Sequence, residues 1–336
     1  MKKVTILGCY NTMASTVTGP MDIFNQAGRL WNRLNRTLQE PSFEVTLVSA
    51  DGNAIQAANN VSIQPHCSIR DIEKTDLIVI SSATYIEKIL EQSPDLPDVL
   101  KEHYEKGAHI ASICTGVFLL AETGLLHGKT ATLHWGFEKM FHQKYPHITL
   151  DTERMYIDHG RLYCSAGSNA GLDLSLYLIE KFCGRKAAVE SAKTMVLDLG
   201  RTKQTPYGSF LDSGDHSDPV ILEIEKKIQA DHVGPIDYDT LADTYRISRR
   251  SLERRFKQAT GMTLLAYVQQ LRVETAKKML EEGRHTFNEI TYKVGYEDIS
   301  FFRKIFTRLT GLRPMEYQKK FAGFGSSFQK EKYLTS

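Results

Sequence analysis

The segment from Ala111 to Phe118 reads ASICTGVF and places Cys114 between a run typical of a buried strand and a run typical of a helix. Such a corner exposes the thiol, and the first amides of the helix lower its pKa, so several enzyme classes keep a nucleophile there. Three interpretations are open for Cys114: a nucleophile, a residue that lines a ligand pocket, or a buried structural cysteine. The elements around it bear on the choice.

The front half of the chain alternates short apolar runs with helix-like segments. Near-continuous apolar runs of this kind are typical of strands buried on both faces of a parallel sheet. Strands are predicted at 4–8, 44–50, 76–82 and 109–114, and helices at 19–38, 85–92 and 97–107. This order predicts a doubly wound α/β domain.

The pattern continues to about residue 200. A strand is predicted at 130–135, and the runs 152–158 and 161–167 predict a hairpin that turns at His159 and Gly160. A helix is predicted over 168–184, ended by Gly184, and another over 187–199. The segment 201–217 is polar and rich in Gly and Pro, which favours a linker.

Composition and charge limit the class of protein. A chain of 336 residues is long enough for two domains, and no apolar run approaches the length needed to span a bilayer. The five cysteines are odd in number and have no metal-type spacing, which favours a reducing cytoplasm and predicts no metal or cofactor. Residues 1–217 hold 21 Lys and Arg against 24 Asp and Glu, whereas 246–320 holds 17 against 8. The basic back half indicates a polyanionic partner.

The basic half contains an internal repeat. The segments 252–267 and 301–317 align with an offset of 50, which places Phe256 over Phe306 and Gly261 over Gly311. Each is preceded by a shorter helical pattern, at 239–245 and 288–294, and by a turn. A short helix, a turn and a second helix, given twice, predict two helix-turn-helix units.

The spacing of apolar residues assigns the faces of the two recognition helices. The predicted core residues are Leu241, Ile247, Leu252 and Phe256 in the first unit and Phe302, Ile305, Phe306 and Leu309 in the second. The predicted DNA-binding faces hold Arg249, Arg250, Glu253, Arg254 and Lys257 in the first unit and Ser300, Arg303, Lys304 and Arg308 in the second.

The N-terminal outward residues of a recognition helix contact bases, and flanking cations contact phosphates. We therefore assign base contacts to Arg250 and Arg254 in one unit and to Ser300 and Lys304 in the other. Ser248 and Asp298 are predicted as N-caps. A long helix over 265–283 would place the two recognition helices in successive major grooves, ~34 Å apart.

The back half resembles the AraC/XylS DNA-binding domain. The resemblance covers 218–321 and rests on LA…ISRRSLERRFKQATG and GYEDISFFRKIFTRLTGLRPMEYQ. Gln318 departs from the family, which commonly has arginine after the tyrosine. The resemblance implies a transcription regulator that binds double-stranded promoter DNA and works with the transcription machinery.

The front half resembles the domain that GlxA-type regulators join to such a DNA-binding domain. The segments that carry this resemblance are GPMDIF at 19–24, 111–135, 165–184 and RTKQTPY at 201–207. It implies a flavodoxin-like, class I glutamine amidotransferase-like fold of the PfpI superfamily. In enzymes of that superfamily the cysteine matching Cys114 is the nucleophile, and His134 matches a histidine that often lies close to it.

Two departures from the enzymes argue against catalysis. The position that carries their carboxylate matches Thr16, and no Asp or Glu occurs between residues 1 and 21. Their Gly-Gly pair after the third strand reads Ser82-Ala83 here, and side chains at these positions crowd the pocket. We expect a pocket that retains the scaffold without the chemistry, lined by Cys114, Thr115, His134, Thr16, Ser82 and Ala83.

These observations together predict a cytoplasmic regulator that is not an enzyme. The expected organisation is a sensor and dimerisation domain at 1–200, a linker at 201–217, a double helix-turn-helix domain at 218–321 and a tail at 322–336. The resemblance implies a small nitrogenous effector and a homodimer. The alternatives are an active cysteine-dependent hydrolase or hydratase fused to a DNA-binding domain, and a structural dimeriser without a ligand.

Overall fold

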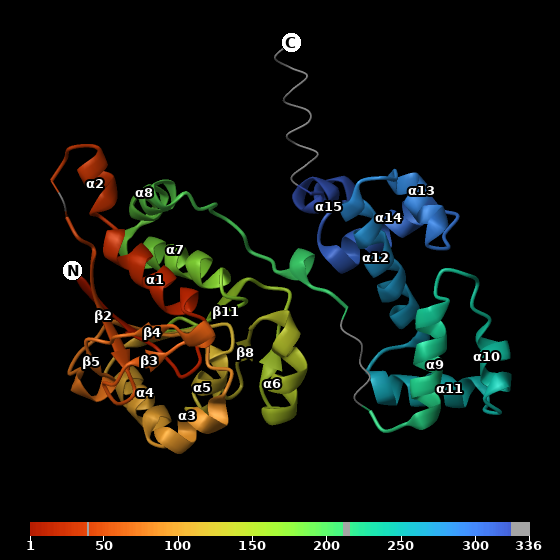
Figure 1. The fold of residues 1–336 in the computed structure, drawn as a ribbon, viewed down its shortest axis with the longest axis horizontal. Coiled ribbons are helices and arrows are strands. Elements are labelled where there is room, and N and C mark those ends of the chain that lie inside the picture. Colours follow the sequence, from red (N-terminus) through yellow and green to blue (C-terminus); the bar gives the residue numbers. More distant parts are fainter. Residues whose placement is uncertain (39, 211–215, 324–336) are drawn as a thin grey trace, which may run out of the picture. The chain divides into compact units, whose positions relative to one another are not determined.

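A computed structural model describes residues 1–38, 40–210 and 216–323. The chain divides into two compact units, Met1–Gln204 and Thr205–Ser336 (Figure 1). Among the described residues, no helix is long and apolar enough to cross a membrane. The tail predicted at 322–336 lies outside the described residues from residue 324 onward.

The first unit is built on a seven-stranded sheet in the order β10-β11-β7-β6-β1-β2-β5. The strands are β1 (Lys2–Leu7), β2 (Phe43–Ser49), β5 (Cys67–Ser68), β6 (Leu77–Ile80), β7 (His109–Ile113), β10 (Tyr156–Asp158) and β11 (Leu162–Ser165). All neighbours are parallel except the β10–β11 hairpin. The predicted doubly wound α/β class and the hairpin at 159–160 are confirmed.

Two small sheets lie outside this order, and their strand pairings were not predicted. One pairs β3 (Ile55–Gln56) with β4 (Ser62–Ile63), and the other pairs β8 (Thr130–Ala131) with β9 (Thr149–Leu150). The strand expected over 130–135 is therefore only two residues long. A 3-10 helix, Trp135–Phe137, follows His134, whose ring accepts a hydrogen bond from the Gly136 amide.

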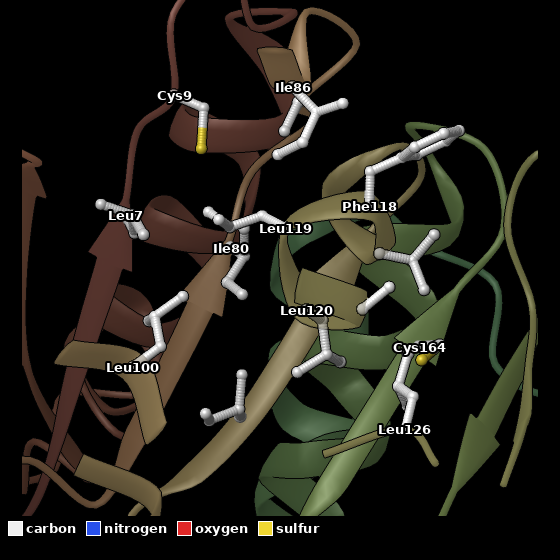
Figure 2. Packing of buried hydrophobic residues seen from close by; sticks show 14 of the residues in the cluster. Leu7, Cys9, Ile80, Ile86, Leu100, Phe118, Leu119, Leu120, Leu126 and Cys164 are labelled. Atoms are coloured by element: carbon white, nitrogen blue, oxygen red, sulfur yellow. The ribbon is translucent and has the colours of Figure 1, made fainter. Parts of the chain in front are cut away.

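Helices cover both faces of the large sheet (Figure 1). The helices α1 (Ser15–Gln26), α7 (Ala170–Cys183) and α8 (Arg185–Met195) pack on one face with Val4, Ile6 and Val79. The helices α3 (Ile86–Gln92), α4 (Leu96–Glu105) and α5 (Gly116–Glu122) pack on the other face with Leu7 and Ile80. Figure 2 shows that second cluster, with Cys9 just beyond the end of β1.

Two predicted helices differ from those observed. The helix expected over 19–38 is broken into α1 and α2 (Leu30–Leu34), because the chain is extended at Ala27 and left-handed at Gly28, where φ is 75°. A Cβ at Gly28 would overlap the carbonyl oxygen of Glu40, so the chain turns there. The helix expected over 187–199 begins at Arg185 and ends at Met195, because Val196 is left-handed. A further helix, α6, spans Glu138–Lys144.

The longer elements described in the second unit are all α-helices. They are α9 (Pro219–Ala230), α10 (Tyr238–Thr244), α11 (Arg249–Thr260), α12 (Leu264–Glu282), α13 (Phe287–Lys293), α14 (Ile299–Thr310) and α15 (Pro314–Phe321). Gly261 and Gly311 end α11 and α14 in the left-handed conformation. The repeat is thus two helix-turn-helix units, α10–α11 and α13–α14, joined by α12.

The polar segment expected as a linker is packed where it is described. Arg201 pairs with the buried Asp173 at 2.7 Å, and Gln204 is itself buried and donates to the carbonyl oxygen of Leu133 at 2.8 Å. In the second unit, Lys277 donates to the carbonyl oxygen of Gly208 at 2.6 Å. Residues 211–215 lie outside the described residues. The linker over 201–217 stays a prediction.

Candidate functional site

The helix α11 presents the first predicted DNA-binding face. The Ser248 side chain accepts from the Ser251 amide at 3.2 Å, as predicted for its N-cap, and Leu252 and Phe256 are buried against Leu241. The other face is exposed and holds the predicted residues Arg249, Arg250, Glu253, Arg254 and Lys257. Sequence spacing therefore assigned the inward and outward faces of α11 correctly.

The cations on α11 differ in what they contact. The Arg249 guanidinium bonds Glu253 at 3.0 Å and Asp239 of α10 at 2.9 Å, and stacks over Tyr238. Within the described chain, Arg250, Arg254 and Lys257 have neither an ion pair nor a side-chain hydrogen bond. Arg249 thus ties α10 to α11, and Arg255 pairs with Asp218 at 2.6 Å, whereas Arg250, Arg254 and Lys257 face outward.

The helix α14 repeats this arrangement with fewer charges. Asp298 caps it by accepting from the amides of Ser300 and Phe301 at 2.8 and 3.0 Å, as predicted. Phe302, Ile305 and Phe306 are buried, and Leu309 packs against them. The outward residues Ser300, Arg303, Lys304 and Arg308 are exposed. Arg308 bonds the Gln269 side chain at 2.8 Å, while Lys304 has no such partner among the described residues.

Arg272 of α12 joins the two helix-turn-helix units and was missed by the sequence analysis. Its guanidinium donates to the carbonyl oxygens of His232 at 2.7 Å, Gly234 at 2.8 Å and Gly295 at 3.1 Å. The first two precede α10 and the third lies in the turn before α14. A Cβ at Gly295 would overlap the carbonyl oxygen of Val233, so the two segments are in close contact.

Cys114 lies at the carboxyl end of β7, where the chain enters α5. Its φ is 54°, a left-handed value that is uncommon for a residue other than glycine. The Cys114 amide donates to the carbonyl oxygen of Ser165 on the neighbouring strand at 3.1 Å. Gly116 permits the turn, because a Cβ there would press on the Ser81 carbonyl oxygen. The sequence predicted the corner, but it did not predict this backbone conformation.

Thr16, which matches the carboxylate position of the enzymes, lies in a network of hydroxyl groups with Ser82 and Thr12. The Thr16 hydroxyl accepts from the Ser82 amide at 3.1 Å and donates to the carbonyl oxygen of Met13 at 2.7 Å. Thr12 adds a third hydroxyl, 2.9 Å from that of Ser82. Thr12, Thr16 and Ser82 are all buried. The two departures inferred from the sequence, at Thr16 and Ser82, thus lie together in one closed network.

The remaining predicted pocket residues are Thr115 and His134, whose backbones bond the Cys114 thiol, and Ala83, which bonds Thr115. The Thr115 hydroxyl accepts from the Ala83 amide at 3.0 Å, and both residues are fully buried. His134 is half-buried, which lowers the pKa of its imidazole. Its Nδ1 accepts from the Gly136 amide at 3.1 Å, so that nitrogen carries no proton.

The surroundings of Cys114 disfavour its thiolate. Burial raises the pKa of the Cys114 thiol, and hydrogen bonds with the backbone of Thr115 and His134 offset this only in part. A cysteine nucleophile needs the opposite shift. The geometry is that of a corner able to hold a nucleophile, with an electrostatic environment that keeps the thiol protonated.

Comparison with known proteins decides the family. The DJ-1/PfpI family model matches residues 2–181, and the helix-turn-helix domain model matches residues 241–320. The HTH-type transcriptional regulator CdhR of Pseudomonas aeruginosa is 30% identical over 266 residues, which cover 77% of this chain and 76% of CdhR. The chain belongs to the DJ-1/PfpI family. It is a helix-turn-helix transcriptional regulator of the GlxA type, with an AraC-type DNA-binding region.

Other similar proteins agree with this assignment. The HTH-type transcriptional regulator GlxA of Rhizobium meliloti is 25% identical, covering 64% of this chain and 66% of GlxA. The isonitrile hydratase of Pseudomonas putida is 25% identical over 170 residues, 50% of this chain and 71% of that enzyme. The crystal structure of Drosophila melanogaster DJ-1beta aligns with a TM-score of 0.50 at 20% identity, over 59% of this chain and 98% of that one, which supports the fold.

Proposed function

We propose that the regulator contacts its operator through α11 and α14, placed in successive major grooves. The observation that carries this proposal is the pair of N-capped helices that present unpaired outward cations from a packed core. Arg250 and Arg254 would contact base edges in one groove, and Ser300 and Lys304 in the next. Phosphate contacts would come from Lys257, Arg303 and Arg308, whereas Arg249, held by Glu253 and Asp239, would orient α11.

Operator binding by alanine variants tests this proposal. We expect Arg254→Ala and Lys304→Ala each to weaken specific binding by about 1–3 kcal/mol, because each removes a base contact. The measurement is fluorescence anisotropy at fixed salt on an operator obtained by in vitro selection. Lys226→Ala on α9 is the control, since it removes an exposed lysine outside both recognition helices. Unchanged binding by both test variants would contradict the assigned faces.

For the first unit we propose a sensor and dimerisation module without catalysis. The raised pKa of Cys114 and the closed hydroxyl network at Thr16 and Ser82 support this proposal, as do the curated relatives that are regulators. A small effector that binds one arrangement of the dimer better than another would shift the placement of the two DNA-binding units. Such a regulator would work in the cytoplasm.

The competing function is cysteine-dependent hydrolysis or hydration. The partial similarity to isonitrile hydratase favours it, and Cys114 keeps the corner geometry. Turnover of isonitriles, amides and glyoxals by the intact chain, compared with Cys114→Ala, separates the two functions. We expect no cysteine-dependent turnover. Turnover that disappears in Cys114→Ala would establish an enzyme fused to a DNA-binding domain and end the sensor-only proposal.

A further inference from the structure

A cavity of about 470 Å³ lies at the carboxyl ends of β1 and β2, beside α3 and α4. Its walls come from the loop after β1, from the end of β2 and the segment that follows it through β3, and from α3 and the start of α4. The lining includes Asp51, Asn53, Ala54, Ile55, Gln56 and Gln92. Open α/β sheets bind ligands at the carboxyl ends of their strands, and this volume is typical of small-molecule pockets.

The cavity is distinct from the corner around Cys114. No residue of the predicted pocket lines it. Cys114 is 4% exposed, and Thr16 and Thr115 are fully buried, so packed side chains leave no room for a ligand beside that thiol. Asp51 and Asn53, in contrast, are exposed at the cavity rim.

The chemistry of the lining selects one class of ligand. Asp51 is the one charged side chain among the residues that line the cavity. Hydrogen bonds from Asn53 lower the pKa of Asp51, so it is ionised at neutral pH. Burial raises the pKa of Cys9 to about 12, so its thiol is neutral. The Lys88 ammonium lies over the Tyr10 ring, 4.0 Å from its centroid, so this ring already has a cationic partner within the protein.

Other lining groups complete the description of the ligand. Side-chain amides come from Asn53, Gln56 and Gln92, while Ile55 and Leu96 supply apolar surface. One ionised carboxylate among neutral amides suits a small polar molecule with a single protonated amine, and it disfavours an anion.

Main-chain hydrogen bonds connect the cavity wall to the Cys114 corner. The Asn11 amide donates to the carbonyl oxygen of Gln56 at 2.7 Å, and the Ala58 amide donates to that of Thr12 at 2.8 Å. The Thr12 hydroxyl lies 2.9 Å from that of Ser82 at the corner. A ligand that moves the β3 segment would therefore move the loop at 11–12 and the start of α1.

We propose that this cavity, and not the Cys114 corner, receives the effector, and that the effector carries a protonated amine that pairs with Asp51. The inference rests on the proposed sensor function and gives it a site and a ligand class. Asp51→Asn removes the charge and retains the Oδ1 acceptor that bonds the Asn53 amide at 3.0 Å. Ala54→Trp fills the cavity, and Asp198→Asn, in a separate cavity of about 260 Å³, is the matched control.

The experiment equilibrates the intact chain and each variant with a deproteinised metabolite extract of bacterial cells. Retained compounds are released and identified by mass spectrometry. We expect the unchanged chain and Asp198→Asn to retain amine-bearing compounds at least tenfold more than Asp51→Asn and Ala54→Trp. A retained amine should also bind at least tenfold more tightly than its neutral N-acetyl form by calorimetry.

The outcomes separate this inference from the sensor function. Equal retention of a compound by all four proteins would exclude the cavity while leaving the sensor function in place, and retention of anions would overturn the ligand class. If no protein retains any compound, the sensor function itself fails. Circular dichroism and operator binding show whether each variant is folded. If Ala54→Trp is not folded, the comparison of Asp51→Asn with the unchanged chain decides the result.

Discussion

Cys114 has a φ of 54°, in a region that costs a residue with a Cβ about 1–3 kcal/mol. Strain of this kind persists where packing enforces it, and here Gly116 and the Ser165 carbonyl hold the turn. Cys114 therefore has the strained backbone turn that would suit an exposed nucleophile, but its thiol is buried. The proposal that this corner is not an active site rests on the burial of the thiol and on the side chains at Thr16 and Ser82.

The pH dependence of Cys114 alkylation tests this electrostatic state. Because its folded pKa is raised above the ordinary thiol value, its thiolate is scarce at neutral pH. We expect the rate of iodoacetamide modification, followed by mass spectrometry of the Cys114 peptide, to rise about tenfold per pH unit from 7 to 9 without a plateau. A plateau near neutral pH would show a stabilised thiolate and favour the enzyme.

Among the helices, α12 has the most demanding role because it holds two recognition helices in one geometry. Its Arg272 bonds segments that precede α10 and α14, so this one guanidinium connects the two units. We expect Arg272→Met to weaken operator binding at least tenfold and to reduce footprinting protection at one of the two grooves. Lys278→Met, an exposed lysine of the same helix, is the control.

Equal protection of both grooves by the Arg272 variant would show that packing alone sets the spacing. Binding lost together with the helical signal in circular dichroism would instead mean that Arg272 supports the fold of the unit. The result expected here is loss of protection at one groove while the helical signal is retained. That result would show that Arg272 positions the two helix-turn-helix units.

Features encoded locally were predictable from the sequence. The Ser248 and Asp298 caps and the buried stripes of α11 and α14 depend on residues within one or two turns, and they were found. Asp239, which pairs with Arg249, and the carbonyl groups that Arg272 bonds lie on other segments, so spacing within one helix gave no signal for them. The cavity depends on the β3 segment, two residues long, which is too short to produce a periodic pattern.

In the whole chain, positive charge is concentrated in the DNA-binding region. Residues 246–320 hold 17 Lys and Arg against 8 Asp and Glu, whereas residues 1–217 hold 21 against 24. Counterion release at phosphates should therefore come from the helical unit, while the first unit adds little nonspecific attraction to DNA. This division leaves the first unit free to respond to a small molecule.

Salt dependence of operator binding tests that division in the intact chain. Because each phosphate contact releases about one counterion, we expect log affinity to fall linearly with log salt, and Lys257→Gln to reduce the slope by about one. Lys129→Gln in the first unit should leave the slope unchanged. A slope that changes equally in both variants would mean that the first unit also lies against DNA, and the charge difference between the halves would then not define the interface.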